Sequence, residues 1–287
     1  MEIRNLTVIG AGTMGSGIAQ VLAQYGFLVT LHDLSPALLE QGLKAIHSSL
    51  DRQIKKGTLS EAQKKEIFSR LSTTADLKRS VESADMIIEA ATENKAVKLQ
   101  LFRTIDGASP AHALLASNTS SISITELAAV TARPEKVIGM HFMNPVPLMK
   151  LVEIIRGLVT SDETFRTVSM LAEKLEKVPV EVRDYPGFVA NRILLPMINE
   201  AVYCVMEGVA APESIDTVMK LGMNHPMGPL TLADFIGLDV CLAILDVLHE
   251  GLGDPKYRAC PLLRKMVAAG HLGRKSGRGF FEYPRSS

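Results

Sequence analysis

The stretch Val8-Ile9-Gly10-Ala11-Gly12-Thr13-Met14-Gly15 decides the fold, because an apolar run leads directly into a G-x-G-x-x-G turn. Helical spacing follows from Ile18 to Gln24, so the turn lies between a strand and a helix, as a dinucleotide-binding turn requires. The first glycine permits the tight turn, the second lets the backbone approach a pyrophosphate, and the third lets the helix pack on the strand. The candidate cofactor-binding residues here are Gly10, Gly12, Thr13, Met14 and Gly15.

Asp33 ends the next apolar run, Phe27 to His32, and lies 21 residues after Gly12. A carboxylate there can accept hydrogen bonds from the adenosine ribose and repels a 2′-phosphate, which favours NAD over NADP. A bare glycine pattern is often an ordinary loop, but here the strand, the helix and the acid agree. A secretory signal is disfavoured because glycines and glutamines interrupt the apolar run.

Composition restricts the class of partner. The 287 residues are 47% hydrophobic and carry 31 basic and 31 acidic side chains, so no overall basic field would attract nucleic acid or a membrane surface. No segment reaches the roughly 18 uninterrupted apolar residues that span a bilayer. Three cysteines, widely spaced and without a C-x-x-C pair, favour neither disulfides nor a zinc site. We expect a cytoplasmic protein with reduced thiols and no metal.

Strand-like and helical runs alternate up to about residue 185, which predicts an α/β sheet covered by helices. A long polar stretch between Pro36 and Leu77 interrupts the alternation and predicts an inserted helical hairpin, with helices from Leu38 to Lys56 and from Ser60 to Phe68. The strands are expected at 6–10, 27–32, 86–90, 113–117, 136–140, 151–155 and 178–182.

From Asp184-Tyr185-Pro186-Gly187 onward the pattern becomes helical. We therefore expect a Rossmann-type NAD-binding domain at 1–184 and an all-α domain for substrate binding and dimerisation at 185–287. Apolar residues on more than one face of the first helix predict a homodimer formed through this second domain. The helices are expected at 188–207, 212–221, 229–249 and 261–269.

His141 and Glu153 lie six residues to either side of Pro147, within two strand-like runs joined by an Asn-Pro-x-Pro turn. If the chain doubles back there, the two side chains face each other. A carboxylate on one imidazole nitrogen fixes the tautomer and leaves the other nitrogen for proton transfer, as a hydroxyl-oxidising enzyme needs. The alternative is a histidine that is simply packed at the end of a strand.

Two polar clusters accompany this pair. Ser117-Asn118-Thr119-Ser120-Ser121 follows an apolar run, at the strand end where open α/β sheets bind ligands. Asn191 lies in the first turns of the first helix of the second domain, where a buried amide needs a polar partner. The alternatives are that the serine-rich run caps a helix from Ile122 to Val130, and that Asn191 makes a hydrogen bond between the domains.

These motifs together resemble the 3-hydroxyacyl-CoA dehydrogenase family, and within it the single-function bacterial members. The resemblance runs the whole chain, and its order and spacing are more specific than any single motif. Two residues depart from the usual pattern, Met143 and Tyr185, and they put only the shape of the acyl pocket in doubt. The segments that carry the resemblance are the glycine turn, Glu93-Asn94, 117–121, 141–145, Glu153, 186–192, 224–230 and 273–281.

The resemblance implies a role for each matching residue. His141 is implied as the general acid/base and Glu153 as its orienting partner, while Ser120 and Asn191 hold the substrate oxygens. The implied cofactor contacts, beyond the glycine turn and Asp33, are Glu93, Lys98, Ser120, Asn144 and Lys275. The implied coenzyme A contacts are Ser49, Lys56, Ser120 and Asn191.

The implied reaction is reversible, NAD-dependent oxidation of a short-chain 3-hydroxyacyl-CoA, most simply 3-hydroxybutyryl-CoA to acetoacetyl-CoA. Relatives that use NADPH make NADP the alternative cofactor. Three other functions stay open: a broader-chain enzyme of β-oxidation, a dehydrogenase of free hydroxy acids, and a non-catalytic NAD-binding protein. The free-acid group is expected to use a lysine where this chain has Asn191.

Overall fold

A computed structural model describes residues 2–284, and the chain divides into two compact units, residues 1–185 and 186–287. The division falls one residue after the boundary expected from the sequence. The first unit is an α/β sheet domain and the second is helical, so the expected fold class is confirmed.

The sheet of the first unit has eight strands in the order β3-β2-β1-β4-β5-β6-β7-β8. The strands from β1 to β6 are parallel, whereas β7 runs antiparallel to β6. Strand order reverses between β1 and β4, which is where open α/β sheets bind ligands. The strands are β1 Asn5–Ile9, β2 Leu28–His32, β3 Leu71–Thr74, β4 Met86–Glu89, β5 Leu114–Ser117, β6 Val137–Phe142, β7 Leu151–Arg156 and β8 Val178–Arg183.

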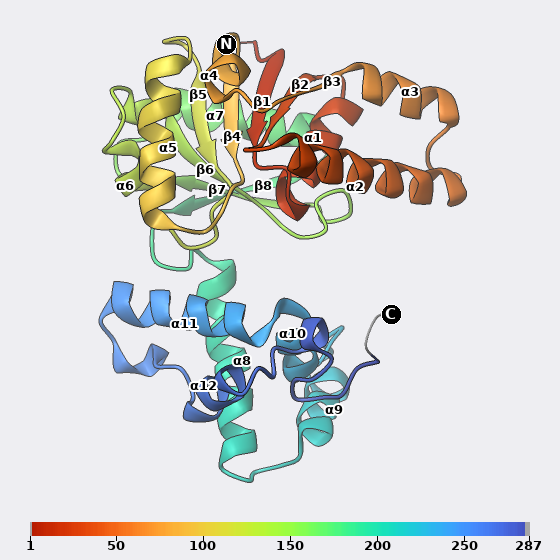
Figure 1. Ribbon diagram of the computed structural model, residues 1–287. Coiled ribbons are helices and arrows are strands. Elements are labelled where there is room, and N and C mark those ends of the chain that lie inside the picture. Colours follow the sequence, from red (N-terminus) through yellow and green to blue (C-terminus); the bar gives the residue numbers. More distant parts are fainter. Residues whose placement is uncertain (1, 285–287) are drawn as a thin grey trace. The chain divides into compact units, whose positions relative to one another are not determined.

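Helices cover both faces of the sheet, with α5 on one side and α1 and α2 on the other (Figure 1). Leu22 of α1, Ile46 of α2 and Leu171 of α7 share one core with strand residues such as Val8 and Met140. Burial on both faces explains the almost continuously apolar strands. The helices of this unit are α1 Thr13–Gln24, α2 Pro36–Lys55, α3 Glu61–Ser69, α4 Leu77–Val81, α5 Lys95–Ala108, α6 Ile124–Ala128, α7 Asp162–Lys174 and the 3₁₀ turn η1 Pro134–Lys136.

The helical hairpin expected after the second strand is present as α2 and α3, which project beyond the sheet (Figure 1). Ser60 starts α3 with a capping box, in which its hydroxyl accepts from the Gln63 N–H and the Gln63 side chain accepts from the Ser60 N–H. The sequence analysis missed β3 and α4, which follow the hairpin. Both are short, and β3 is an edge strand whose middle residues, Ser72 and Thr73, are exposed and polar.

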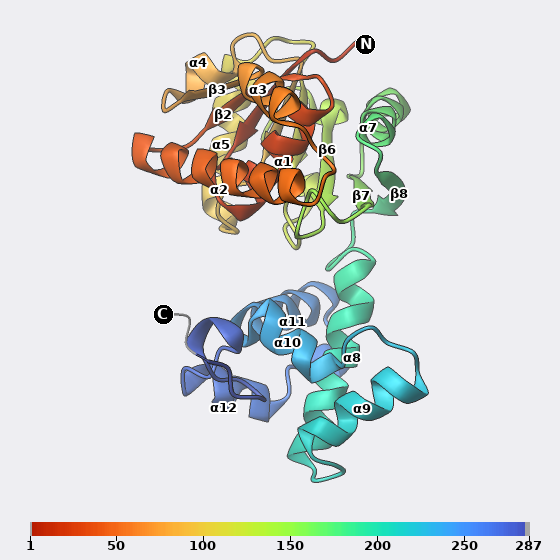
Figure 2. The same ribbon diagram turned by 90° about the vertical axis from the view of Figure 1, so that its right-hand side faces the viewer.

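The second unit packs its helices around α8 (Figure 2). One helix expected from Pro229 to His249 is instead two, because Gly237, with φ +106°, breaks it. The helices are α8 Ala190–Met206, α9 Pro212–Gly222, α10 Pro229–Ile236, α11 Leu238–Leu252, α12 Pro261–Ala268 and the 3₁₀ turns η2 Pro255–Tyr257 and η3 Arg274–Ser276. Within residues 2–284, no helix has the length and apolar character needed to cross a membrane.

Candidate active site

The glycine turn between β1 and α1 fits a dinucleotide. Gly10 has φ +102°, and a Cβ there would lie 2.5 Å from the Ala90 carbonyl oxygen, so only glycine fits. A Cβ on Gly15 would lie 1.7 Å from the Gly10 carbonyl oxygen. Because glycine has no Cβ, α1 can pack tightly on the turn. A Cβ on Gly12 would meet no atom within 4 Å, and no side chain caps α1. The N-terminus of α1 therefore offers space and backbone N–H groups to a pyrophosphate.

Asp33 follows β2 and is fixed beside this turn. One carboxylate oxygen accepts from the Ala11 N–H and the other from the Leu34 N–H, each at 2.6 Å. These bonds hold the negative charge at the carboxyl end of β2, next to the end of β1. That position suits an acceptor for ribose hydroxyls and opposes a 2′-phosphate.

His141 and Glu153 face each other across β6 and β7. They are direct partners in the antiparallel register, and His141 Nδ1 lies 2.8 Å from Glu153 Oε2. Both residues are buried, with 8% and 2% of their surface exposed. The doubling back expected from the symmetric spacing is thus observed. It places an imidazole–carboxylate pair on the side of the sheet where the parallel strands have their carboxyl ends, which is also where the glycine turn follows β1.

Asn118 connects neighbouring strands at this end of the sheet, and the sequence analysis placed it there within the polar run 117–121 without giving it a role of its own. Its side-chain oxygen accepts from the Phe142 N–H at 2.9 Å, next to His141, and its own N–H donates to the Glu89 carbonyl at 2.7 Å. The suggestion that residues 117–121 cap the following helix is wrong, since Ser123 caps α6. An amide directly after an apolar strand was the available signal for Asn118.

Glu93 accepts hydrogen bonds from the turn that contains Ser120. One carboxylate oxygen accepts from the Thr119 hydroxyl at 2.6 Å, from the N–H groups of Ser120 and Ser121 at 3.0 and 3.1 Å, and from both serine hydroxyls. Burial alone would raise the pKa of Glu93, but the Lys98 ammonium and these hydrogen bonds outweigh it, so the pKa is lowered. The carboxylate stays ionised and orders the turn.

Lys98 was expected near the cofactor, and the structure places it deeper. Its Nζ lies 2.6 Å from Glu89 Oε1 and 3.5 Å from Glu93 Oε2, and the residue is 1% exposed. Lys98 therefore acts on the site surface through Glu93. The sequence analysis missed Glu89, although an acid at the end of the buried run Met86–Glu89 was a usable signal.

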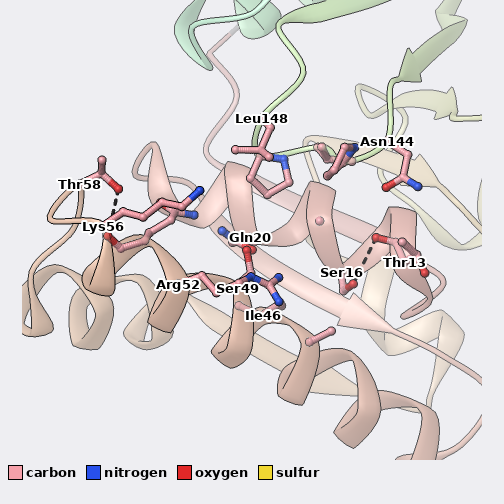
Figure 3. A pocket seen from close by; sticks show the side chains of 16 residues that line it. Thr13, Ser16, Gln20, Ile46, Ser49, Arg52, Lys56, Thr58, Asn144 and Leu148 are labelled. Atoms are coloured by element: carbon pink, nitrogen blue, oxygen red, sulfur yellow. Dashed lines mark hydrogen bonds between the residues drawn. The ribbon is translucent and has the colours of Figure 1, made fainter. Parts of the chain in front are cut away.

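A pocket of about 650 Å³ lies between α1, α2 and the loop that joins β6 to β7. Ser49, Arg52 and Lys56 line it from α2 and its end, opposite Asn144 and Leu148 of the loop (Figure 3). Two cations and a hydroxyl at the rim of a pocket with apolar walls suit a ligand that has an apolar arm and phosphates.

Two expected residues belong to the second unit. Asn191 is half-buried in the first turn of α8, and Lys275 lies in η3, where its Nζ is 2.6 Å from a carboxylate oxygen of Asp239. In the part of the chain that the structure describes, no cluster of three His, Cys, Asp or Glu side chains is placed to hold a metal ion.

Two family models match the chain. The model for the 3-hydroxyacyl-CoA dehydrogenase NAD binding domain matches residues 5–185, and the model for the C-terminal domain of the same family matches residues 187–283. Together they cover both structural units.

Similar proteins match over nearly their whole length. A probable 3-hydroxybutyryl-CoA dehydrogenase of Bacillus subtilis is 62% identical over 99% of this chain and 98% of that protein. The human mitochondrial hydroxyacyl-coenzyme A dehydrogenase is 41% identical over 98% of this chain and 91% of that protein. The crystal structure of an (S)-3-hydroxybutyryl-CoA dehydrogenase from Ralstonia eutropha superposes with a TM-score of 0.96 at 52% identity, covering 99% of this chain and all of that one.

Proposed function

This chain belongs to the 3-hydroxyacyl-CoA dehydrogenase family and catalyses NAD-dependent oxidation of a 3-hydroxyacyl-CoA, and from that premise we propose that its substrate pair is 3-hydroxybutyryl-CoA and acetoacetyl-CoA. The similarity to proteins named for this short-chain substrate supports the proposal. The His141–Glu153 pair is the observation that carries the chemistry.

His141 acts as the general acid/base. With Glu153 on Nδ1, Nε2 is the nitrogen that exchanges a proton with the 3-oxygen of the substrate, removing it on oxidation and returning it on reduction. The nicotinamide, when bound, accepts or donates the hydride at C3. Glu153 keeps one tautomer and stabilises the imidazolium that forms during oxidation.

Ser120 and Asn191 are proposed to donate hydrogen bonds to the substrate oxygens, which limits the charge that develops there. Glu93 orders the Ser120 turn, which supports a fixed position for the Ser120 hydroxyl. The glycine turn and Asp33 are proposed to hold the dinucleotide, with Asn144 and Lys275 as further contacts.

The 650 Å³ pocket is proposed to receive the coenzyme A arm. Arg52 and Lys56 supply positive charge for its phosphates at the rim, and Ser49 supplies a hydroxyl. This local charge matters because the chain has no net charge overall.

We further propose that the protein is a cytoplasmic homodimer that associates through its helical unit. Val218 and Leu221, one helical turn apart on α9, expose 58% and 81% of their surfaces. Two large apolar side chains on one helical face are consistent with a covered surface in a dimer. The three free cysteines are consistent with a reducing compartment.

A substrate series tests the proposal. The reduction of acetoacetyl-CoA and of longer 3-oxoacyl-CoA esters is measured with NADH and, separately, with NADPH. We expect the highest kcat/KM for acetoacetyl-CoA with NADH. A preference for a longer chain would instead assign the enzyme to broad-chain oxidation, and a preference for NADPH would overturn the role given to Asp33.

A further inference from the structure

Glu89 is the most deeply buried charged residue of the sheet edge that carries the site. It ends β4, where it pairs in register with Ile9 of β1 and Ser117 of β5, so it lies at the centre of the sheet. Its side chain is 0% exposed, and that of its partner Lys98 is 1% exposed. An ion pair fully removed from water therefore lies directly beneath the glycine turn and the Ser120 turn.

Stability does not account for such a pair. Removing a carboxylate and an ammonium from water is unfavourable for each ion, and apolar residues in place of a buried pair are often neutral or stabilising. A buried ion pair instead fixes geometry, since each of its hydrogen bonds is charge-assisted and directional. The neighbours of Glu89 show which geometry it fixes.

Two chains of polar contacts lead from Glu89 to the same turn. In the first, the Ser117 hydroxyl donates to Glu89 Oε2 at 2.6 Å and accepts from the Thr119 N–H at 3.1 Å. In the second, Glu89 Oε1 holds Lys98 Nζ at 2.6 Å, Lys98 lies 3.5 Å from Glu93 Oε2, and the other oxygen of Glu93 binds Thr119 and Ser120. Both series of contacts therefore connect the Ser120 turn to the buried carboxylate of Glu89.

A third contact leads to the glycine turn. The Ala91 N–H donates to Glu89 Oε1 at 2.7 Å, and residues 90 and 91 form the backbone surface against which Gly10 packs. One carboxylate thus joins the glycine turn and the Ser120 turn, both of which the proposed function gives to the dinucleotide.

We propose that Glu89 is a positioning residue for dinucleotide binding, which sets the Ser120 turn and the glycine turn at their working distance through Ser117, Lys98 and Ala91. This inference rests on the proposed function, because it takes the cofactor to be NAD. Glu89 and Lys98 are too buried to contact the cofactor themselves, so their effect passes through Glu93 and the backbone.

The test measures the Kd for NADH of wild type and Glu89→Gln, using the increase in NADH fluorescence when NADH binds to the protein. Gln keeps the shape but removes the charge that holds Lys98. We expect the Kd for NADH to rise about 10-fold or more, because charge-assisted hydrogen bonds are lost in both series of contacts that lead from Glu89 to the Ser120 turn. In turnover assays KM for NADH rises with it.

The matched control is Glu126→Gln, which removes the carboxylate partner of Lys95, an exposed lysine on the same helix α5 as Lys98. We expect no change in its Kd for NADH. The double variant Glu89→Gln/Lys98→Met removes both buried charges. We expect it to regain thermal stability lost in the single variant but not the affinity for NADH, whereas a purely structural role predicts that both return.

A Kd for Glu89→Gln within 2-fold of wild type overturns the inference, and so does recovered affinity in the double variant. If Glu89→Gln does not fold, Ser117→Ala, which breaks only the first chain, decides the question by the same titration, with a weaker Kd expected and an unchanged Kd overturning the inference. The readout is independent of the substrate assignment: a wild-type protein that binds NADH but does not reduce acetoacetyl-CoA refutes the proposed function alone.

Discussion

At the scale of single residues, carboxylates in or after the strands lie against each of the candidate functional groups. Glu153 holds His141, Glu93 orders the Ser120 turn, and Asp33 lies beside the glycine turn. The His141–Glu153 pair could be predicted because its spacing around Pro147 is visible in one short segment. An acid at the end of the buried run Met86–Glu89 was a signal for Glu89, but its partners could not be predicted, because they come from segments that only the folded sheet brings together.

The lowered pKa of Glu93 predicts a pH-dependent contribution to stability. A carboxyl group whose pKa is lower in the folded protein stabilises the fold above its ordinary pKa of 4.5, and that stabilisation is lost as pH falls through the lowered value. We expect wild type to melt at a higher temperature than Glu93→Gln at neutral pH. The gap should be constant down to about pH 5 and shrink below 4.5. A gap that is the same at every pH would contradict this account.

At the scale of elements, the α2–α3 hairpin supplies the charged rim of the pocket. The hairpin could be predicted from a long polar helical stretch and the Ser60 start signal. The edge strand β3 could not, since its four residues lack an apolar pattern, and the break at Gly237 was hidden because apolar residues continue on both sides of it.

Removing the rim charges should weaken recognition of coenzyme A without affecting the chemistry. A hydrogen bond to a charged group contributes about 1.5–3 kcal/mol, so Arg52→Ala and Lys56→Ala should each raise KM for acetoacetyl-CoA by about 10-fold or more. The kcat should stay near that of wild type. For the N-acetylcysteamine thioester of acetoacetate, which lacks the phosphates, KM should be unchanged. An equal rise with both substrates would show that these residues do not read the phosphates.

At the scale of the whole molecule, the sheet unit carries the glycine turn, the His141–Glu153 pair and the pocket, whereas the helical unit carries Asn191, Lys275 and the exposed face of α9. This division could be predicted from the change in pattern near Pro186. The surface that a dimer would cover could not be predicted from the sequence, because apolar residues on several helix faces do not say which face packs inside its own unit.

The exposed face of α9 predicts the oligomeric state. Light scattering coupled to size exclusion should give twice the 31.1 kDa mass of the chain. Val218→Asp/Leu221→Asp places two charges on that face, so it should shift the mass toward one chain at micromolar concentration. Lys220→Asp, on the same helix, changes charge without replacing an apolar residue and should stay dimeric. A wild-type protein that runs as a single chain would refute the dimer.

The most direct test of the central claim is the steady-state rate of acetoacetyl-CoA reduction by NADH for wild type, His141→Ala and Glu153→Gln. General acid/base catalysis contributes about 10²–10⁴-fold, so His141→Ala should lose kcat by that factor while its Kd for NADH stays near that of wild type. Glu153→Gln should lose kcat in the same direction, because the tautomer is no longer fixed. His112→Ala, at an exposed histidine of the same unit paired with Asp85, should be fully active. A His141→Ala protein that retains wild-type turnover would contradict the assignment of the acid/base.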